Sequence, residues 1–239
     1  MTPELRFLLN DQEIRLTDVG ASDTLLDHLR IARRLTGTKE GCAEGDCGAC
    51  TVLLGRLTET GLVYEPINAC IRFLASCHGC HVVTVEHIHA PDGGLHPIQK
   101  AMVENHGSQC GFCTPGIVMS LYGLWMGNPD AGVTEIETAL QGNLCRCTGY
   151  EPIVKAALAA GQAGGQAMDA LLVERDRVAD TLRGMWGERV ELSRGGQRAI
   201  IPTDTDDLAA LLEDHPKATI VAGSTDVGLW VTKFLRDIS

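Results

Sequence analysis

The sequence predicts an α+β multidomain protein built from three segments, and three observations support this class. Short β-like runs surround one helical stretch in residues 1–90. Four helix-start signals with helical periodicity follow in residues 91–163. Gly164-Gly165 then marks a boundary before a polar, weakly periodic stretch, 164–197, which we expect to be a connector. A third α+β segment occupies 198–239, and a length of 239 residues allows one to three domains.

The first segment is expected to form a compact α+β domain. Residues 5–9 and 12–16 flank Asn10-Asp11, which is typical of a two-residue hairpin. Apolar residues at helical spacing then predict a helix that ends at Gly37. Its candidate N-caps are Ser22, Asp23 and Thr24. Further strand-like runs lie at 51–54, 62–64 and 82–86.

The second segment is expected to contain four helices. Pro97, Pro115 and Pro152 each favour a first helical turn, because proline has no amide hydrogen to leave unpaired there. The remaining helix is predicted from a capping box that begins at Thr134. Gly161 is expected to end the last helix.

The third segment begins with a short amphipathic helix, 206–213, that is ended by Pro216. An apolar strand is predicted at 219–222, followed by a glycine turn and a further helix towards Asp237.

The charge balance is acidic, with 31 Asp and Glu against 20 Lys and Arg. Such a surface repels phosphate backbones, so nucleic-acid binding is disfavoured. The sequence has no run of 18 apolar residues, so it predicts no membrane span. The first 16 residues do not resemble a secretory signal. We therefore expect a cytoplasmic protein, in which clustered cysteines bind metal more often than they form disulfides.

The first cysteine group has the spacing of a plant-type [2Fe–2S] centre. Cys42, Cys47 and Cys50 share one glycine-rich loop, and Cys70 follows at a distance. Glycines let such a loop turn sharply and aim its amides at sulfur. The alternatives are buried free cysteines and a zinc site, but zinc loops usually carry two separated pairs of ligands.

The second cysteine group consists of Cys110 and Cys113 at one predicted helix end, with Cys145 and Cys147 at another. Four thiolates from two helix ends could hold one cluster, and amides at a helix N-terminus favour an anion. This pattern alone does not separate zinc from iron–sulfur. The presence of the first cysteine group favours a second [2Fe–2S] centre here, because two centres form a path for electrons.

The remaining candidates are weaker. Cys77 and Cys80 match the C-x-x-C-H haem-attachment pattern, but two reduced structural cysteines are the simpler interpretation. His87 and His89 could form a metal pair or could face solvent. The strand–Gly223–helix order suits a pyrophosphate held on backbone amides, although an ordinary turn explains it equally well.

Taken together, these residues resemble the molybdenum hydroxylase (xanthine oxidase) family. Residues 39–52 (KEGCAEGDCGACTV) and 68–70 (NAC) look like its first cluster site. Residues 109–116 (QCGFCTPG) and 142–150 (GNLCRCTGY) are close to diagnostic for it. Residues 221–230 (VAGSTDVGLW) are similar to the pyrophosphate loop of the family's flavin domain.

The resemblance implies a β-grasp [2Fe–2S] ferredoxin domain at 1–90 and a four-helix [2Fe–2S] domain at 91–163. It implies that 198–239 is the incomplete start of an α+β FAD-binding domain, since the family's flavin domain is far longer than 42 residues. It also implies a separate, larger molybdopterin-binding subunit that hydroxylates xanthine or hypoxanthine. Electrons then pass through both clusters to FAD and on to NAD, within a heterotetramer or higher assembly.

Residue roles follow from the resemblance alone. Cys110, Cys113, Cys145 and Cys147 match the ligands of the cluster nearer molybdenum, and Cys42, Cys47, Cys50 and Cys70 match those of the cluster nearer FAD. Gln109 matches a residue that touches the pterin. The positions that match the flavin loop are Ile220, Val221, Ala222, Gly223, Ser224, Thr225, Asp226 and Val227.

Three other functions stay open on the sequence. The chain could serve an aldehyde-type molybdenum hydroxylase, because purine and aldehyde hydroxylases share this electron path. It could also be a free-standing two-cluster carrier or a zinc-stabilised adaptor. Clusters visible by EPR would exclude the adaptor, and co-purification with molybdenum and flavin would exclude the free carrier.

Overall fold

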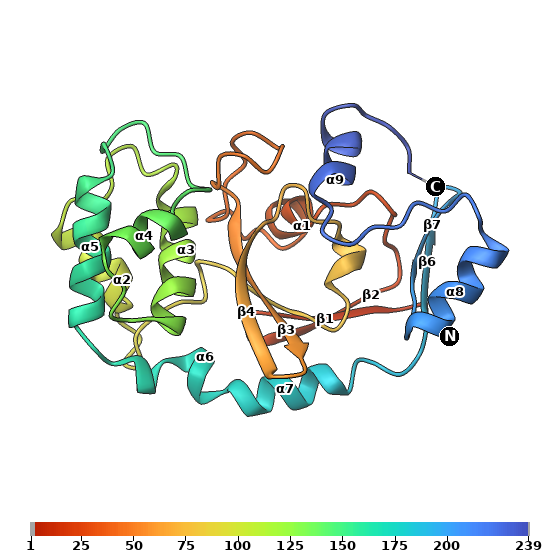
Figure 1. Cartoon of the computed structure of the whole chain (residues 1–239), viewed down its shortest axis with the longest axis horizontal. Coiled ribbons are helices and arrows are strands. Elements are labelled where there is room, and N and C mark those ends of the chain that lie inside the picture. Colours follow the sequence, from red (N-terminus) through yellow and green to blue (C-terminus); the bar gives the residue numbers. More distant parts are fainter. Residues whose placement is uncertain (1–2, 239) are drawn as a thin grey trace.

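The computed structural model describes residues 3–238, so residues 1, 2 and 239, at the outer ends of the first and last predicted segments, lie outside the described residues. A bundle of helices α2–α5 lies at one end of the molecule, a β-sheet lies in the middle, and a hairpin with α8 lies at the other end (Figure 1). Helices α6 and α7 run along one side and join the two ends. Across 3–238, no helix is both long and apolar enough to span a membrane.

A five-stranded mixed sheet forms the centre of the first segment. Its strands are β1 (Leu5–Leu9), β2 (Gln12–Leu16), β3 (Thr51–Thr58), β4 (Gly61–Asn68) and β5 (His81–Val83), in the order β2-β1-β5-β3-β4. Among the described residues of this sheet, β1 pairs with β5 in parallel and the other neighbouring strands pair antiparallel. The predicted hairpin at Asn10 is confirmed, with a positive φ of 56° at that residue. Strands β3 and β4 extend beyond the predicted runs.

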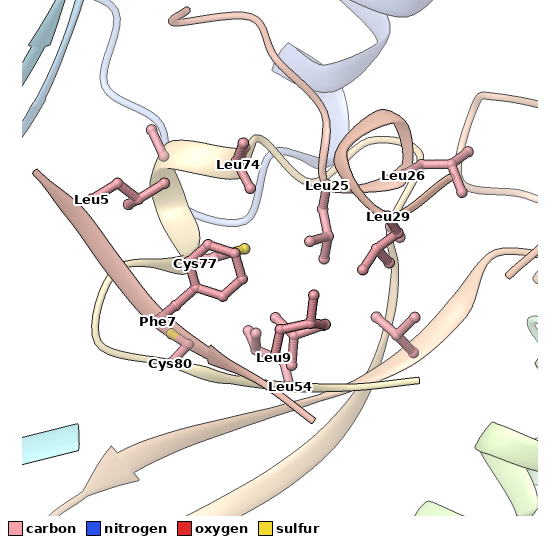
Figure 2. Close-up of a cluster of buried hydrophobic side chains, with 14 of the residues drawn as sticks. Leu5, Phe7, Leu9, Leu25, Leu26, Leu29, Leu54, Leu74, Cys77 and Cys80 are labelled. Carbon is pink, nitrogen blue, oxygen red and sulfur yellow. The ribbon is translucent and has the colours of Figure 1, made fainter. Parts of the chain in front are cut away.

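One helical element covers the first face of this sheet. It starts as α1 (Leu25–Asp27) and continues as a π-helix, η1 (His28–Ala32). Thr24 caps it, since its hydroxyl accepts the Asp27 amide at 3.1 Å. The helix ends at Ala32, so the predicted end at Gly37 is wrong. Figure 2 shows Leu25 and Leu29 directed into a core with strand residues such as Phe7.

The second face of the sheet packs against the helices. Leu53 and Val83 belong to the same buried cluster as Ile117 and Met119 of α3. Alternate residues of β3 therefore enter two different cores, and this explains why Thr51 to Gly55 are all buried. The helices are α2 (Pro97–Glu104), α3 (Thr114–Gly127), α4 (Val133–Ala139) and α5 (Glu151–Gln162).

The four predicted helix starts hold with one correction. Helix α4 is capped at Gly132, and the predicted capping box at Thr134 is wrong. The Glu135 carboxylate accepts the Gly132 amide at 2.8 Å, so it caps the residue three positions before it and Thr134 lies inside the helix.

The stretch expected as a connector has more regular structure than its composition indicated. It contains η3 (Gln166–Met168), α6 (Ala170–Val173), α7 (Arg175–Arg183) and strand β6 (Val190–Arg194). Val178 and Leu182 of α7 are buried against Leu8 and Leu62 of the sheet. The polar composition concealed this helix because only its one buried stripe is apolar.

Strand β6 pairs with β7 (Gln197–Ile201), and α8 (Thr205–Asp214) and α9 (Thr225–Thr232) follow. The helix predicted at 206–213 is confirmed as α8. The strand predicted at 219–222 is wrong: this segment has no partner strand among the described residues, and Ile220 is 60% exposed. An apolar run needs a neighbouring strand edge to form a ladder.

A buried polar network fastens the chain after α5 to the helices. Asp169, the N-cap of α6, accepts the Tyr122 hydroxyl at 2.8 and 2.9 Å and lies 3.2 Å from His96 Nε2. All three side chains are buried, and burial together with the Asp169 carboxylate raises the pKa of Tyr122. Since His96 Nδ1 accepts the Ile98 amide, the Nε2 atom carries the hydrogen that Asp169 accepts.

We predict that Asp169→Ala destabilises the protein by about 3–5 kcal/mol, because it leaves buried His96 and Tyr122 groups without a partner. Tyr122→Phe, which removes one donor and keeps the ring, should cost only about 1 kcal/mol. Urea unfolding measures both changes. Equal, small losses in the two variants would contradict the network's role.

Candidate metal centres

The first cysteine loop folds around the sulfur of Cys42. The backbone amides of Glu44, Asp46 and Cys47 each donate to Cys42 Sγ at 3.4 Å. Positive φ angles of 75° at Gly45 and 68° at Gly48 make this turn possible. Burial raises the pKa of the Cys42 thiol, but these three amides outweigh it and hold the pKa below its ordinary value. The loop therefore favours a thiolate at this position.

The four thiols of the first group come together as two pairs. Cys42 lies beside Cys47, and Cys50 lies beside Cys70. Cys70 lies just beyond β4, and the side chain of Asn68 at the end of that strand donates to the Gly45 carbonyl at 2.7 Å. The sheet thus holds the fourth cysteine against the loop that carries the other three.

The second group also consists of two pairs. Cys113, the N-cap of α3, lies beside Cys145, and Cys110 lies beside Cys147. Burial raises the pKa of the Cys113 thiol to about 12, with its neighbour Cys145 adding to the effect. The Cys145 thiol has a lowered pKa despite its burial, because Thr148 bonds to it at 3.1 Å.

This pairwise arrangement suits a cluster of two irons better than one metal ion. Each iron of a [2Fe–2S] cluster takes two thiolates, whereas a zinc ion takes four ligands around one point. The donor set of eight thiols, with amides directed at sulfur, fits two such clusters.

The two cysteine groups meet backbone to backbone. The Leu144 amide donates to the Cys47 carbonyl at 2.9 Å, and Asn143 Nδ2 donates to the Gly48 carbonyl at 3.1 Å. A Cβ at Gly48 would overlap the Gly142 carbonyl, and a Cβ at Gly116 would overlap the Gly48 carbonyl. Only glycine permits this close approach. As a result, a single hydrogen bond connects Cys47 directly to Leu144, the residue before Cys145.

Asn143 and Gly116 were not singled out by sequence reasoning, although both lie in the strings that carried the family resemblance. Asn143 is buried and accepts the Ser120 hydroxyl at 2.7 Å, so it joins α3 to both cysteine loops. Its position directly before Leu144 and Cys145 was the available signal.

The other two cysteines, Cys77 and Cys80, belong to neither group. Cys77 and Cys80 are buried in the core shown in Figure 2, and burial raises the pKa of Cys77 to about 12. Neither thiol is accessible for haem attachment, and His78 bonds instead to the Met185 carbonyl at 2.9 Å. The rings of His87 and His89 lie 6.2 Å apart.

The segment that resembles a flavin loop is largely open to solvent. Ser224 is the exception: it is buried, has a positive φ of 60°, and its hydroxyl has no partner among the described residues. Ser224 occupies the N-cap position of α9, and the free backbone amides at a helix N-terminus favour a phosphate. Ile220, Val221, Ala222, Gly223, Thr225, Asp226 and Val227 surround it along the chain, and Gln109 is exposed beside Cys110. Ser224 is therefore the residue here that best fits a phosphate group.

Residues 84–158 match the model of the [2Fe-2S] binding domain family. A xanthine dehydrogenase of Drosophila pseudoobscura pseudoobscura is 36% identical over 268 residues, which cover 96% of this chain and 20% of that protein. Aldehyde oxidase 1 of Oryctolagus cuniculus is 46% identical over 156 residues, 64% of this chain and 12% of that protein. The chain thus spans a fifth or less of the length of these relatives.

Two solved structures have a similar fold. Quinoline 2-oxidoreductase of Pseudomonas putida 86 matches with a TM-score of 0.59 and 32% identity, over 67% of this chain and 94% of that chain. Aldehyde oxidoreductase of Desulfovibrio gigas matches with a TM-score of 0.60 and 34% identity, over 69% of this chain and 18% of that chain.

We predict that Gly48→Ala separates the two cysteine groups and lowers the free energy of unfolding by about 2 kcal/mol or more, because the added Cβ overlaps the Gly142 carbonyl. Gly164→Ala is the matched control, since Gly164 has a nearly equal φ of 66° but open space around it. Denaturant unfolding compares the two. If both variants lost a similar amount of unfolding free energy, backbone strain at positive φ would explain the loss, and the overlap with the Gly142 carbonyl would not be needed.

The match to a [2Fe-2S] binding domain, the paired thiols and the similarity to the relatives and solved structures agree with one another. The chain belongs to the molybdenum hydroxylase (xanthine oxidase) family.

Proposed function

We propose that this chain is the iron–sulfur electron-transfer component of a molybdenum-dependent xanthine dehydrogenase. The observation that carries the proposal is the direct contact between two four-thiol groups, made by Cys47 and Leu144. Two redox centres joined in this way form a path, whereas two structural metal sites need no such contact.

In this proposal, Cys42, Cys47, Cys50 and Cys70 bind one [2Fe–2S] cluster in a β-grasp domain, residues 1–90. Cys110, Cys113, Cys145 and Cys147 bind the other in a four-helix domain, residues 91–163. The clusters supply one-electron redox chemistry when bound. The residues around them hold thiolates in place and direct amides at sulfur, which stabilises the negative charge of the centre.

The exposure of the second group supports the proposed order of the path. Cys110 and Cys147 are exposed, as are Gln109 and the Phe112 ring between the cysteines of this group. A larger molybdopterin-binding subunit that docks on this face would deliver electrons to the second group first. The Cys47–Leu144 contact would then pass them to the first group, which lies beside α9.

The final stretch, 198–239, is proposed to open an FAD-binding domain whose remainder lies outside this sequence, with 164–197 as the connector. The Ser224 hydroxyl at the N-terminus of α9 is buried and has no hydrogen-bond partner within residues 3–238, which supports a phosphate of FAD at 220–227. NAD is the proposed final acceptor, and a heterotetramer or higher assembly in the cytoplasm is the proposed form.

A second candidate is the same role in an aldehyde-type hydroxylase. Aldehyde oxidase 1 of Oryctolagus cuniculus is 46% identical over 156 residues, and a xanthine dehydrogenase/oxidase of Felis catus is 47% identical over 154 residues, so this similarity supports the two candidates equally. In this proposal the substrate binds to the partner subunit, so the cluster residues serve either reaction.

Purification of the native complex tests the proposed function. We expect molybdenum, flavin and iron to co-purify with the chain, and xanthine or hypoxanthine to drive NAD reduction. Oxidation of aldehydes without purine turnover would favour the second candidate. A colourless chain with stoichiometric zinc, or one that never co-purifies with molybdenum, would overturn the proposal.

We predict that Cys145→Ser abolishes the EPR signal of one reduced cluster and keeps the other, because its pair partner Cys113 belongs to the second group only. Cys50→Ser should remove the complementary signal. Cys77→Ser, in the core, is the control and should keep both. Loss of both signals in folded Cys145→Ser protein would contradict the assignment of two separate sites.

A further inference from the structure

Helix α9 lies directly against the first cysteine group. A Cβ at Gly228 would come within 2.7 Å of the Ile71 carbonyl, and Ile71 is the neighbour of Cys70. Leu229 packs against the core cluster that contains Cys50 and Cys70. The contact is thus close enough that this helix position requires glycine.

Lys233, which follows the last residue of α9, also contacts the first cysteine group. Lys233 Nζ donates to the Cys42 carbonyl at 2.5 Å and lies 3.6 Å from the Glu44 carboxylate. The Glu44 amide in turn donates to Cys42 Sγ. One positive and one negative side chain therefore lie beside the cysteine whose sulfur receives three amides.

We propose that Lys233 and Glu44 form a charge pair that sets the reduction potential of the first centre and couples it to the docking of α9. This inference rests on the proposed function, since it takes the first group as a [2Fe–2S] site. Reduction adds one electron to the cluster and transfers no atom, so the centre becomes more negative by one charge. A nearby ammonium stabilises that state more than the oxidised one, and a nearby carboxylate does the opposite.

The two residues therefore have opposite expected effects. Lys233 raises the potential of the first centre and favours its reduction, and Glu44 lowers it. Both side chains are partly exposed, at 38% and 44%, so salt should screen each effect. The second group lies beyond the Cys47–Leu144 contact and should respond much less.

A reductive titration of the full chain with both clusters bound, followed by EPR, tests this inference. We expect Lys233→Met to shift the first centre to a more negative potential and to leave the second centre unchanged. Lys233→Arg, which keeps the charge, should shift it little. Glu44→Gln should shift it to a more positive potential, and each shift should shrink at high salt. Lys100→Met removes a lysine charge on α2 and should move neither centre.

Gly228→Ala tests whether the potential of the first centre depends on the docking of α9. The added Cβ should undock α9, so this variant should show the negative shift of Lys233→Met and faster proteolysis after residue 214. Equal potentials in the wild type, Lys233→Met and Glu44→Gln, with both EPR signals present, would overturn the inference alone. Absence of both signals in the wild type would instead overturn the proposed function.

Discussion

The approach of Gly48 to Gly142 and Gly116 is the constraint on which the rest of the structure depends. It brings a sheet-supported loop and a helix-supported loop within one hydrogen bond of each other, from Leu144 to the Cys47 carbonyl. Asn143 completes this contact by bonding to Gly48 and Ser120. In the proposed function, this contact is the link through which electrons pass between the two cysteine groups.

The chain around this contact keeps the two cysteine groups in fixed positions. Strand β3 contributes alternate residues to two cores, so the same strand supports both groups. Asp169 fastens the chain after α5 to the helices, and α7 then packs Leu182 against the sheet. These contacts join the helical end of the molecule to the central sheet, and α7 runs along the side of that sheet (Figure 1).

Charge acts locally in this acidic protein. Lys233 lies beside Cys42 and Glu44. In our proposal, this one nearby positive charge affects the reduction potential of the first centre more than the overall net charge of −11 does, because electrostatic interactions weaken with distance. The same helix carries the buried Ser224 hydroxyl at its other end. Helix α9 thus has a polar group fit for a phosphate at its start and a cation near the first cysteine group at its end.

The sequence by itself predicted the four helices, three of them from prolines in their first turns, and the β1–β2 hairpin, because such residues act within a few positions of one another. Cysteine spacing also predicted the two groups. Only the tertiary structure decided how thiols pair, that 219–222 has no partner strand among the described residues, and that α7 is a helix against the sheet. These features depend on contacts between residues far apart in the chain, such as Gly48 with Gly142 or Lys233 with Cys42. Local sequence patterns do not predict such contacts.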